Sequence, residues 1–122
     1  MPWQFRNDLP IYTQLMSQLQ QRIVSGALAP GERLLSVRDL ASEAGVNPNT
    51  MQRALTELER MGLVYSQRTA GRFVTDDEGR IRQLREELAR DLAEEFLAGM
   101  EKLGFAQGEA LDFVKREGER NA

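Results

Sequence analysis

The sequence predicts a mainly α-helical protein with one small β-hairpin, arranged as an N-terminal winged helix-turn-helix and a C-terminal segment of two helices. Three observations favour this fold. Two short helices with clear start and stop signals lie between Leu35 and Leu63, a hairpin pattern follows them directly, and two amphipathic stretches come last. An acidic stretch after Thr75 marks the expected boundary, so residues 1–75 form the first domain and residues 76–122 the second.

The composition limits the class of protein. The chain has 122 residues, of which 41% are hydrophobic and 29% are charged, as in ordinary globular proteins. No apolar run approaches the roughly 18 residues that cross a bilayer, and the N-terminus lacks the basic and apolar regions of a signal peptide. The chain also has no cysteine and hence no disulfide. We therefore expect a cytoplasmic protein that has no membrane partner.

The chain has neither histidine nor cysteine. These residues supply the commonest general base, the thiol nucleophile and the usual zinc ligands. An enzyme that relies on carboxylates or lysine is the remaining catalytic alternative, but no clustered pair of titratable groups stands out. We therefore expect no catalytic residues, no bound metal and no cofactor.

The net charge of −3 hides an asymmetry between the two halves of the chain. Residues 1–75 contain eight arginines, no lysine and six acids, a net charge of +2, whereas residues 76–122 contain eight basic residues and thirteen acids, a net charge of −5. The planar guanidinium fork of arginine suits phosphate and guanine. The first half is therefore the better candidate for contact with nucleic acid.

An aromatic arm that contains Trp3 leads into the first expected helix. Pro10 suits a first helical turn, and Gly26 suits a helix end. Leu34–Leu35 fits either a very short strand or the entry to the next helix. The apolar residues between these signals recur every four positions and form one stripe: Ile11, Leu15, Leu19 and Ile23.

Two helices joined by a tight turn follow. Ser36 and Asp39 fit a capping box, in which the Ser36 hydroxyl accepts the Asp39 amide and the Asp39 carboxylate reaches back. Gly45 stops this helix, and Asn47 with Pro48 starts the next. Because so short a turn makes the two helices cross steeply, the pattern predicts a helix-turn-helix.

The second of these helices has a polar face without an acid. At 100° per residue its apolar side, predicted to be core, contains Met51, Ala54, Leu55, Leu58 and Met61. Its opposite side contains Asn49, Gln52, Arg53, Thr56 and Arg60, with Thr50 on a flank and both Glu57 and Glu59 off its centre. An ordinary solvated surface is the alternative, but such faces usually mix glutamate with lysine. This face instead indicates a helix that enters the major groove of DNA.

A β-hairpin is expected directly after Gly62. Leu63–Arg68 and Arg72–Thr75 fit two short strands around a turn at Thr69–Gly71. A plain structural sheet is the alternative, but Arg68 and Arg72 on both sides of the tip favour contact with phosphate or the minor groove. A helix-turn-helix with such a hairpin is a winged helix.

The last segment predicts two helices, one from Arg80 to about Leu103 and one from Ala106 to about Arg120. The four-residue spacing of the first stripe argues against a long coiled coil. Two helices of this size cannot bury both apolar faces on each other, so we expect a second copy of the chain as partner. The expected dimerisation residues are Leu84, Leu88, Leu92, Phe96, Met100, Leu111 and Val114.

Over about residues 10–74 the chain resembles the GntR family of bacterial transcription regulators, and its length is similar to that of the short YtrA-type subfamily. The matching motifs are Pro10-Ile11-Tyr12-x-Gln14-Leu15, Leu28-x-Pro30-Gly31-Glu32-Arg33-Leu34, Ser36-Val37-Arg38-Asp39-Leu40-Ala41, Gly45-Val46-Asn47-Pro48-Asn49-Thr50, Arg53-Ala54-x-x-Glu57-Leu58, Gly62-Leu63 and Gly71-x-Phe73-Val74. The C-terminal helices resemble the subfamily by length and pattern only.

The resemblance implies a homodimer that binds a palindromic operator in double-stranded DNA, usually as a repressor. It implies that Arg38 reaches a base, that the start of the third helix contacts bases or phosphates, and that Gly71 lets the wing backbone enter the minor groove. Arg38 has the alternatives of a phosphate contact or an ion pair with Asp39 or Glu43. The DNA-binding residues expected from pattern and resemblance together are Ser36, Arg38, Asn47, Asn49, Thr50, Gln52, Arg53, Thr56, Arg68, Gly71 and Arg72.

The wing departs from the family pattern. The family commonly has a glycine and a tip arginine where this chain has Thr69 and Ala70, and Arg72 stands where threonine is usual, so it is a candidate to compensate. Gln52 stands where many members have arginine.

The sequence leaves two further alternatives open. A winged helix can be a protein-interaction module without specific DNA binding, although the acid-free face and the arginines of the wing argue against it. The C-terminal segment is too small for the ligand-binding domains of larger relatives, and a small-molecule effector of unknown identity, at the dimer seam or between the domains, stays open as a partner.

Overall fold

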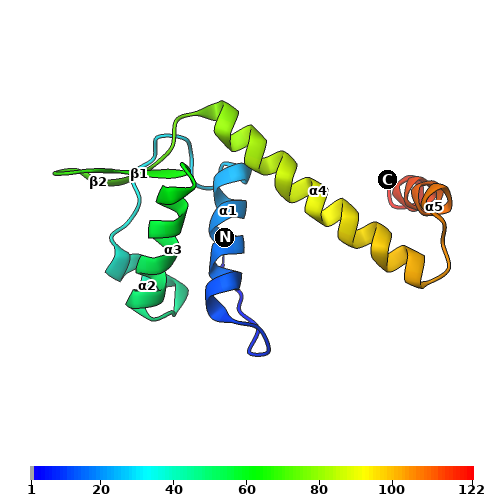
Figure 1. Ribbon diagram of the computed structural model, residues 1–122, viewed down its shortest axis with the longest axis horizontal. Coiled ribbons are helices and arrows are strands. Elements are labelled where there is room, and N and C mark those ends of the chain that lie inside the picture. Colours follow the sequence, from blue (N-terminus) through cyan, green and yellow to red (C-terminus); the bar gives the residue numbers. More distant parts are fainter. Residues whose placement is uncertain (1) are drawn as a thin grey trace. The chain divides into compact units, whose positions relative to one another are not determined.

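The structure is a computed structural model that describes residues 2–122 (Figure 1). In this range it contains five helices and one two-stranded antiparallel sheet, which confirms the predicted fold class. The elements in chain order are α1 (Ile11–Ser25), α2 (Val37–Ala44), α3 (Pro48–Arg60), β1 (Val64–Gln67), β2 (Gly71–Val74), α4 (Glu78–Lys102) and α5 (Gln107–Arg120).

The chain forms two compact units, one that ends at Arg85 and one that spans Glu86–Ala122. This division falls inside α4, later than the acidic stretch after Thr75 that the sequence indicated. The reason is visible in the first two turns of α4, where Leu84 is only 2% exposed. In the same turns, the Arg80 Nε donates a hydrogen bond to the Met61 carbonyl oxygen at 3.0 Å. The start of α4 therefore belongs to the first unit.

The core of the first unit lies where α3 packs on α1 and α2 (Figure 1). The predicted stripe of α1 is buried at Leu15, Leu19 and Ile23, whereas Ile11 at its start is exposed. The predicted apolar side of α3 is buried from Met51 to Leu58, and Met61 is half-buried. Burial of the apolar side of α3 turns its opposite, polar side to solvent.

Side-chain caps hold the turn between α2 and α3. The Ser36 Oγ accepts a hydrogen bond from the Asp39 amide at 3.1 Å, and Gly45 ends α2 with a φ of 72°. The Asn47 Oδ1 accepts the Asn49 amide at 2.7 Å, with Pro48 at the first helical position. Within residues 2–122, no hydrogen bond joins the Asp39 carboxylate to the Ser36 amide, so only half of the expected capping box forms.

The β-hairpin has a third, short neighbour. Val64 pairs with Val74, and Tyr65 pairs with Phe73. On the free side of β2, the Leu34 amide donates to the Arg72 carbonyl at 2.9 Å, and the Val74 amide donates to the Glu32 carbonyl at 2.9 Å. Arg33 thus forms a one-residue bridge with Phe73, whereas Leu34–Leu35, which the sequence left open as a very short strand or the entry to the next helix, is not itself part of a strand and leads into α2.

The N-terminal arm runs back along α1. The Gln18 and Gln14 side-chain amides each exchange hydrogen bonds with the backbone of the arm, at Gln4 and Arg6 respectively. At the end of the arm, the Trp3 Nε1 donates to the Glu43 carboxylate of α2 at 3.1 Å, and the Arg22 guanidinium lies 3.9 Å from the centre of the Trp3 ring. The arm therefore ties α1 to α2.

The second unit has a small core. Met100 and Ala110 are buried, and the rings of Phe105 and Phe113 meet edge to face with their centres 5.5 Å apart. Several large apolar side chains stay exposed in this unit: Leu92, Phe96, Leu103, Leu111, Phe113 and Val114. None of the helices in residues 2–122 has the length and apolar character that spanning a membrane requires.

Replacement of Arg80 by alanine tests the attachment of α4 to α3. Met61 follows the last turn of α3, so its carbonyl oxygen has no partner in that helix. We expect Arg80→Ala to lower the free energy of unfolding by about 1–2 kcal/mol, measured by urea denaturation. Arg82→Ala is the matched control, because Arg82 is exposed on the same helix and makes no hydrogen bond among the described residues. Equal effects of the two substitutions would contradict the role given to Arg80.

Candidate nucleic-acid interface

The exposed face of α3 consists of polar side chains. Asn49, Gln52, Arg53 and Thr56 are all exposed, and Thr50 is half-buried on the flank. The Gln52 Nε2 donates to the Thr56 Oγ1 at 3.2 Å. These side chains offer amide, hydroxyl and guanidinium groups to a ligand on this side of the helix. The structure thus brings together the residues that the sequence placed on the reading side of the helix.

The cation of Arg53 rests on an aromatic ring from another helix. Its Cζ lies 4.0 Å from the centre of the Tyr12 ring of α1. The guanidinium lies over the ring and makes no hydrogen bond or ion pair within residues 2–122, so its N–H groups stay available to an acceptor.

The other arginine on α3 is already paired. The Arg60 Nε donates to the Glu57 carboxylate at 2.9 Å. This hydrogen bond to Arg60 lowers the pKa of the Glu57 carboxyl, and Glu57 raises the pKa of Arg60, with a further contribution from the Tyr12 phenol. Both side chains therefore stay charged at neutral pH and offset each other. Arg53 remains as the cation of α3 that has no acid partner in the described part of the chain.

Arg38 extends from the first turn of α2. It is exposed, and it makes no ion pair or hydrogen bond within residues 2–122, so the pairing with Asp39 or Glu43 that the sequence allowed is not formed. The side chains of Ser36 and Asn47 accept hydrogen bonds from backbone amides and cap the starts of α2 and α3. Their first role is therefore to shape the turn that presents Arg38 and α3.

Arg72 is less exposed than expected for an arginine beside the tip of the wing. Its side chain is 21% exposed, and its Nε lies 3.9 Å from the Glu59 Oε2 of α3. Because Ser66 and Arg72 are paired between Val64–Val74 and the tip, Arg72 shares the inner face of the sheet with the buried valines. This contact with Glu59 disfavours Arg72 as the replacement for the missing tip arginine.

A cation that the sequence pattern did not indicate lies over the wing instead. A Cβ built on Gly71 would lie 3.4 Å from the Arg33 Nε, so the Arg33 side chain crosses the bare backbone of Gly71. Gly71 also has a φ of 102°, which disfavours any other residue. Arg33 is exposed and bridges to Phe73, which places it on the outer face of the hairpin. Together with exposed Arg68 in the turn, it supplies the positive charge of the wing.

The signal for Arg33 in the sequence was weak. Alternation of exposed Arg33 with buried Leu34 fits a strand, but the pairing with Phe73 joins segments forty residues apart. A pattern within one window cannot show such a pairing.

The expected dimerisation residues divide into two groups. Leu84 is 2% exposed and Met100 is 8% exposed in the isolated chain, because each already belongs to the core of its own unit, so neither is free to meet a partner. Leu92 is 67% exposed and Phe96 is 42% exposed, and Leu111 and Val114 of α5 are exposed as well. Leu88 is half-buried.

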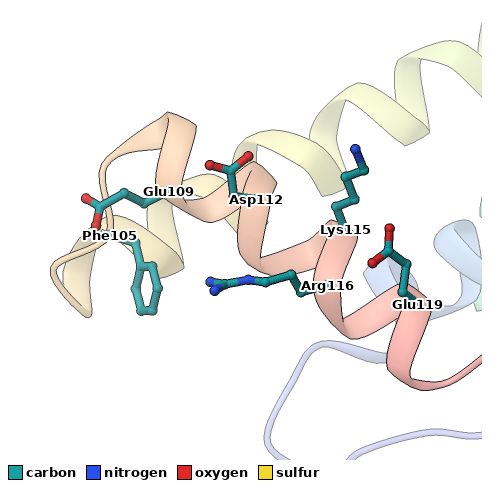
Figure 2. Close-up of a pocket in the computed structure, with 6 residues that line it drawn as sticks. All are labelled: Phe105, Glu109, Asp112, Lys115, Arg116 and Glu119. Carbon is teal, nitrogen blue, oxygen red and sulfur yellow. The ribbon is translucent and has the colours of Figure 1, made fainter.

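The second unit also carries an open hollow along α5, with a volume of about 480 Å³ (Figure 2). One aromatic ring, Phe105, lines one end, and Figure 2 shows the Arg116 side chain extending toward it. The other lining residues are charged, whereas typical small-molecule sites are mostly apolar. They are Glu109, Asp112, Lys115 and Glu119. No group of three or more acidic side chains in residues 2–122 is arranged to hold a metal.

These features define the class of protein. Three helices, a hairpin with a third bridging segment and an exposed polar helix opposite the core make up a winged helix. Residues 11–74 match the family of bacterial regulatory proteins called the gntR family. The chain belongs to the GntR family and is a transcriptional regulator with a DNA-binding helix-turn-helix.

Two relatives from Bacillus subtilis (strain 168) are similar over most of their length. The HTH-type transcriptional regulator YhcF is 38% identical over 92% of this chain and 93% of its own. The HTH-type transcriptional repressor YtrA is 33% identical over 79% of this chain and 78% of its own. The family is one of regulators and not of enzymes, and the similarity to YtrA confirms the expected YtrA-like subfamily.

Two solved structures are informative. A GntR family transcriptional regulator from Listeria monocytogenes has a TM-score of 0.85 and 40% identity, and the match covers 92% of this chain and 98% of that chain. The DNA-binding domain of AraR in complex with the operator ORX1 has a TM-score of 0.54 and 26% identity, over 62% of this chain and 99% of that chain.

Arg33 beside the hairpin and Arg72 within it should differ in their effect on DNA binding. We expect Arg33→Ala to weaken binding to duplex DNA of any sequence and to reduce the slope of log K against log salt by about 0.9, because one phosphate contact is lost. Arg72→Ala should leave this slope unchanged, since Arg72 faces Glu59. Fluorescence anisotropy at several salt concentrations measures both slopes. A change in slope for Arg72 but not for Arg33 would reverse the assignment.

Proposed function

We propose that the chain acts as a dimeric transcriptional repressor that binds a palindromic operator with α3 and the wing. The observation that carries the proposal is the exposed face of α3, where Asn49, Gln52, Arg53 and Thr56 stand together without an exposed acid. The AraR domain, which is similar to this chain, is described in complex with its operator.

The chemistry of this face fits the edges of bases. An α-helix fits the major groove, where amide side chains pair with adenine and arginine pairs with guanine. Gln52 and Asn49 supply the amides, and Arg53 supplies a guanidinium whose N–H groups are available to an acceptor. In this proposal Arg38 reaches the same groove from α2, because no ion pair or hydrogen bond within residues 2–122 holds its guanidinium.

The wing contributes affinity more than sequence selection in this proposal. Arg68 in the hairpin turn and Arg33 in the segment beside β2 are exposed cations, and a contact with phosphate fixes the position of a protein on DNA without reading its sequence. Gly71 leaves room for the Arg33 side chain. Ala70 at the tip carries no charge, so deep insertion of the tip into the minor groove is not part of the proposal.

The second unit is the proposed dimer interface. Leu92 and Phe96 of α4 and Leu111 and Val114 of α5 form apolar surface that a lone chain leaves in water. Residues 86–122 contain five basic and ten acidic side chains, and this acidic balance disfavours contact of the second unit with DNA, which leaves it to pair subunits. Two copies related by a two-fold axis present two α3 helices to a palindromic site.

Repression is the proposed sign of regulation because the similar protein YtrA is named a transcriptional repressor. In this proposal the bound chain represses by occupying promoter DNA that the polymerase would otherwise bind.

Selection from a pool of random DNA duplexes tests sequence-specific binding. We expect the full-length chain to enrich an inverted repeat whose half-sites lie about 10 base pairs apart, or a multiple of that distance. Uniform, salt-sensitive retention of all duplexes would mean that the chain binds only the DNA backbone. An absence of binding at low salt would favour a protein-interaction module.

Arg38 is expected to read a base. Arg38→Ala should weaken binding to the selected operator by about 10- to 100-fold, because one bidentate pair with guanine contributes about 1–3 kcal/mol. Binding to a scrambled duplex should change much less. Titrations of both duplexes at one salt concentration give the comparison, and equal losses on both would assign Arg38 to a phosphate.

A charge on the exposed stripe of α4 tests the dimer interface. We expect Leu92→Glu to convert the dimer to a monomer in sedimentation-velocity ultracentrifugation, because the carboxylate would be buried in the interface without a partner. Gln83→Glu adds the same charge to the opposite side of the helix and should leave the dimer intact. If the Leu92 variant sediments as the unchanged chain does, α4 is not the interface.

A further inference from the structure

Tyr12 and Arg53 form a contact between the first helix and the proposed reading face. Tyr12 is half-buried in the first turn of α1, and its ring lies beneath the Arg53 guanidinium with 4.0 Å between the Cζ and the ring centre. Arg53 itself is exposed on α3. A cation thus projects from α3 while an aromatic side chain of α1 supports it from one side.

Other groups that could fix Arg53 are engaged elsewhere. The acid one turn away on α3, Glu57, is bonded to Arg60. No hydrogen bond or ion pair of Arg53 occurs within residues 2–122, so the Tyr12 ring is the interaction that the structure gives it. The direction of the Arg53 side chain therefore depends on α1.

The geometry leaves Arg53 ready to bind. A guanidinium that lies over a ring keeps its N–H groups free, because these groups lie in the guanidinium plane and point outward from its edge. A free arginine loses much rotamer freedom when it binds an acceptor, and a stacked one has already lost part of it. The support of the ring should therefore strengthen a contact with an acceptor on DNA.

We propose that Tyr12 is a positioning residue that holds Arg53 in the direction in which it contacts the operator, so that α1 takes part in operator affinity. The inference rests on the proposed function and extends the binding surface beyond the helix-turn-helix and the wing. A different role for the same residue is a direct hydrogen bond from the phenol hydroxyl to a phosphate, and substitution separates the two.

Two substitutions of Tyr12 in the full-length chain distinguish the ring from the hydroxyl. Tyr12→Phe keeps the ring under Arg53, so operator affinity should stay within about twofold of the unchanged chain. Tyr12→Leu removes the ring and should weaken operator binding by about two- to fivefold, as expected for loss of one exposed cation–π contact. Loss of affinity in the phenylalanine variant equal to that in the leucine variant would overturn the proposal in favour of a hydroxyl contact.

A double-mutant cycle ties the effect to Arg53. Arg53→Ala should weaken operator binding by itself, and Tyr12→Leu should then cause no further loss in the Arg53→Ala background. Additive losses would overturn the proposal, because Tyr12 would then act without Arg53. An effect of Arg53→Ala with none of Tyr12→Leu would overturn it as well.

A measurement without DNA separates this proposal from the proposed function. The Arg53 Nε–H signal in a ¹⁵N NMR spectrum should carry the shift caused by the nearby ring, keep it in Tyr12→Phe and lose it in Tyr12→Leu. Its presence in a chain that selects no operator would leave the positioning contact standing and remove the proposed function. An Arg53 signal that is the same in all three chains would overturn the positioning role whether or not the chain binds DNA.

Discussion

Burial of one side of α3 is the constraint on which the interface depends. Met51, Leu55 and Leu58 are almost fully buried against the rest of the first unit, and their burial supplies several kcal/mol, on the order of 1.5–3 for each side chain. A rotation of α3 about its axis would expose them and bury the polar residues opposite. The same packing that stabilises the unit therefore fixes which side chains can face DNA.

The arginines of the first unit differ in whether an acidic side chain lies beside them. Arg60 and Arg72 meet Glu57 and Glu59, so their charge is offset within the protein. Arg33, Arg38 and Arg68 are exposed and have no acid partner in the described part of the chain. A count of arginines in the first half of the sequence overstates the charge that DNA would meet, and the pairing with acids shows where that charge lies.

Local signals predicted much of this arrangement. Helix caps such as Ser36 and Asn47 act within three residues of their own position, so the sequence located the starts of α2 and α3 correctly. The period of the apolar residues predicted the buried side of α3. Contacts between distant segments could not be predicted from local patterns in the sequence. Arg33 lies against Gly71 because its segment bridges to β2. Arg72 faces inward because of its register with Ser66. The burial of Leu84 and the link from Trp3 to Glu43 are of the same kind.

Titration of the ¹⁵N-labelled full-length chain with its selected operator tests the central claim most directly. We expect the largest changes in backbone amide signals at Asn49–Thr56, with further changes near Arg38 and at the Arg68 turn. We also expect the amide signals of α5 to change little, apart from changes that contact between the two subunits of the dimer causes. Changes confined to the second unit, or spread evenly over both units, would contradict the claim that the exposed face of α3 reads DNA.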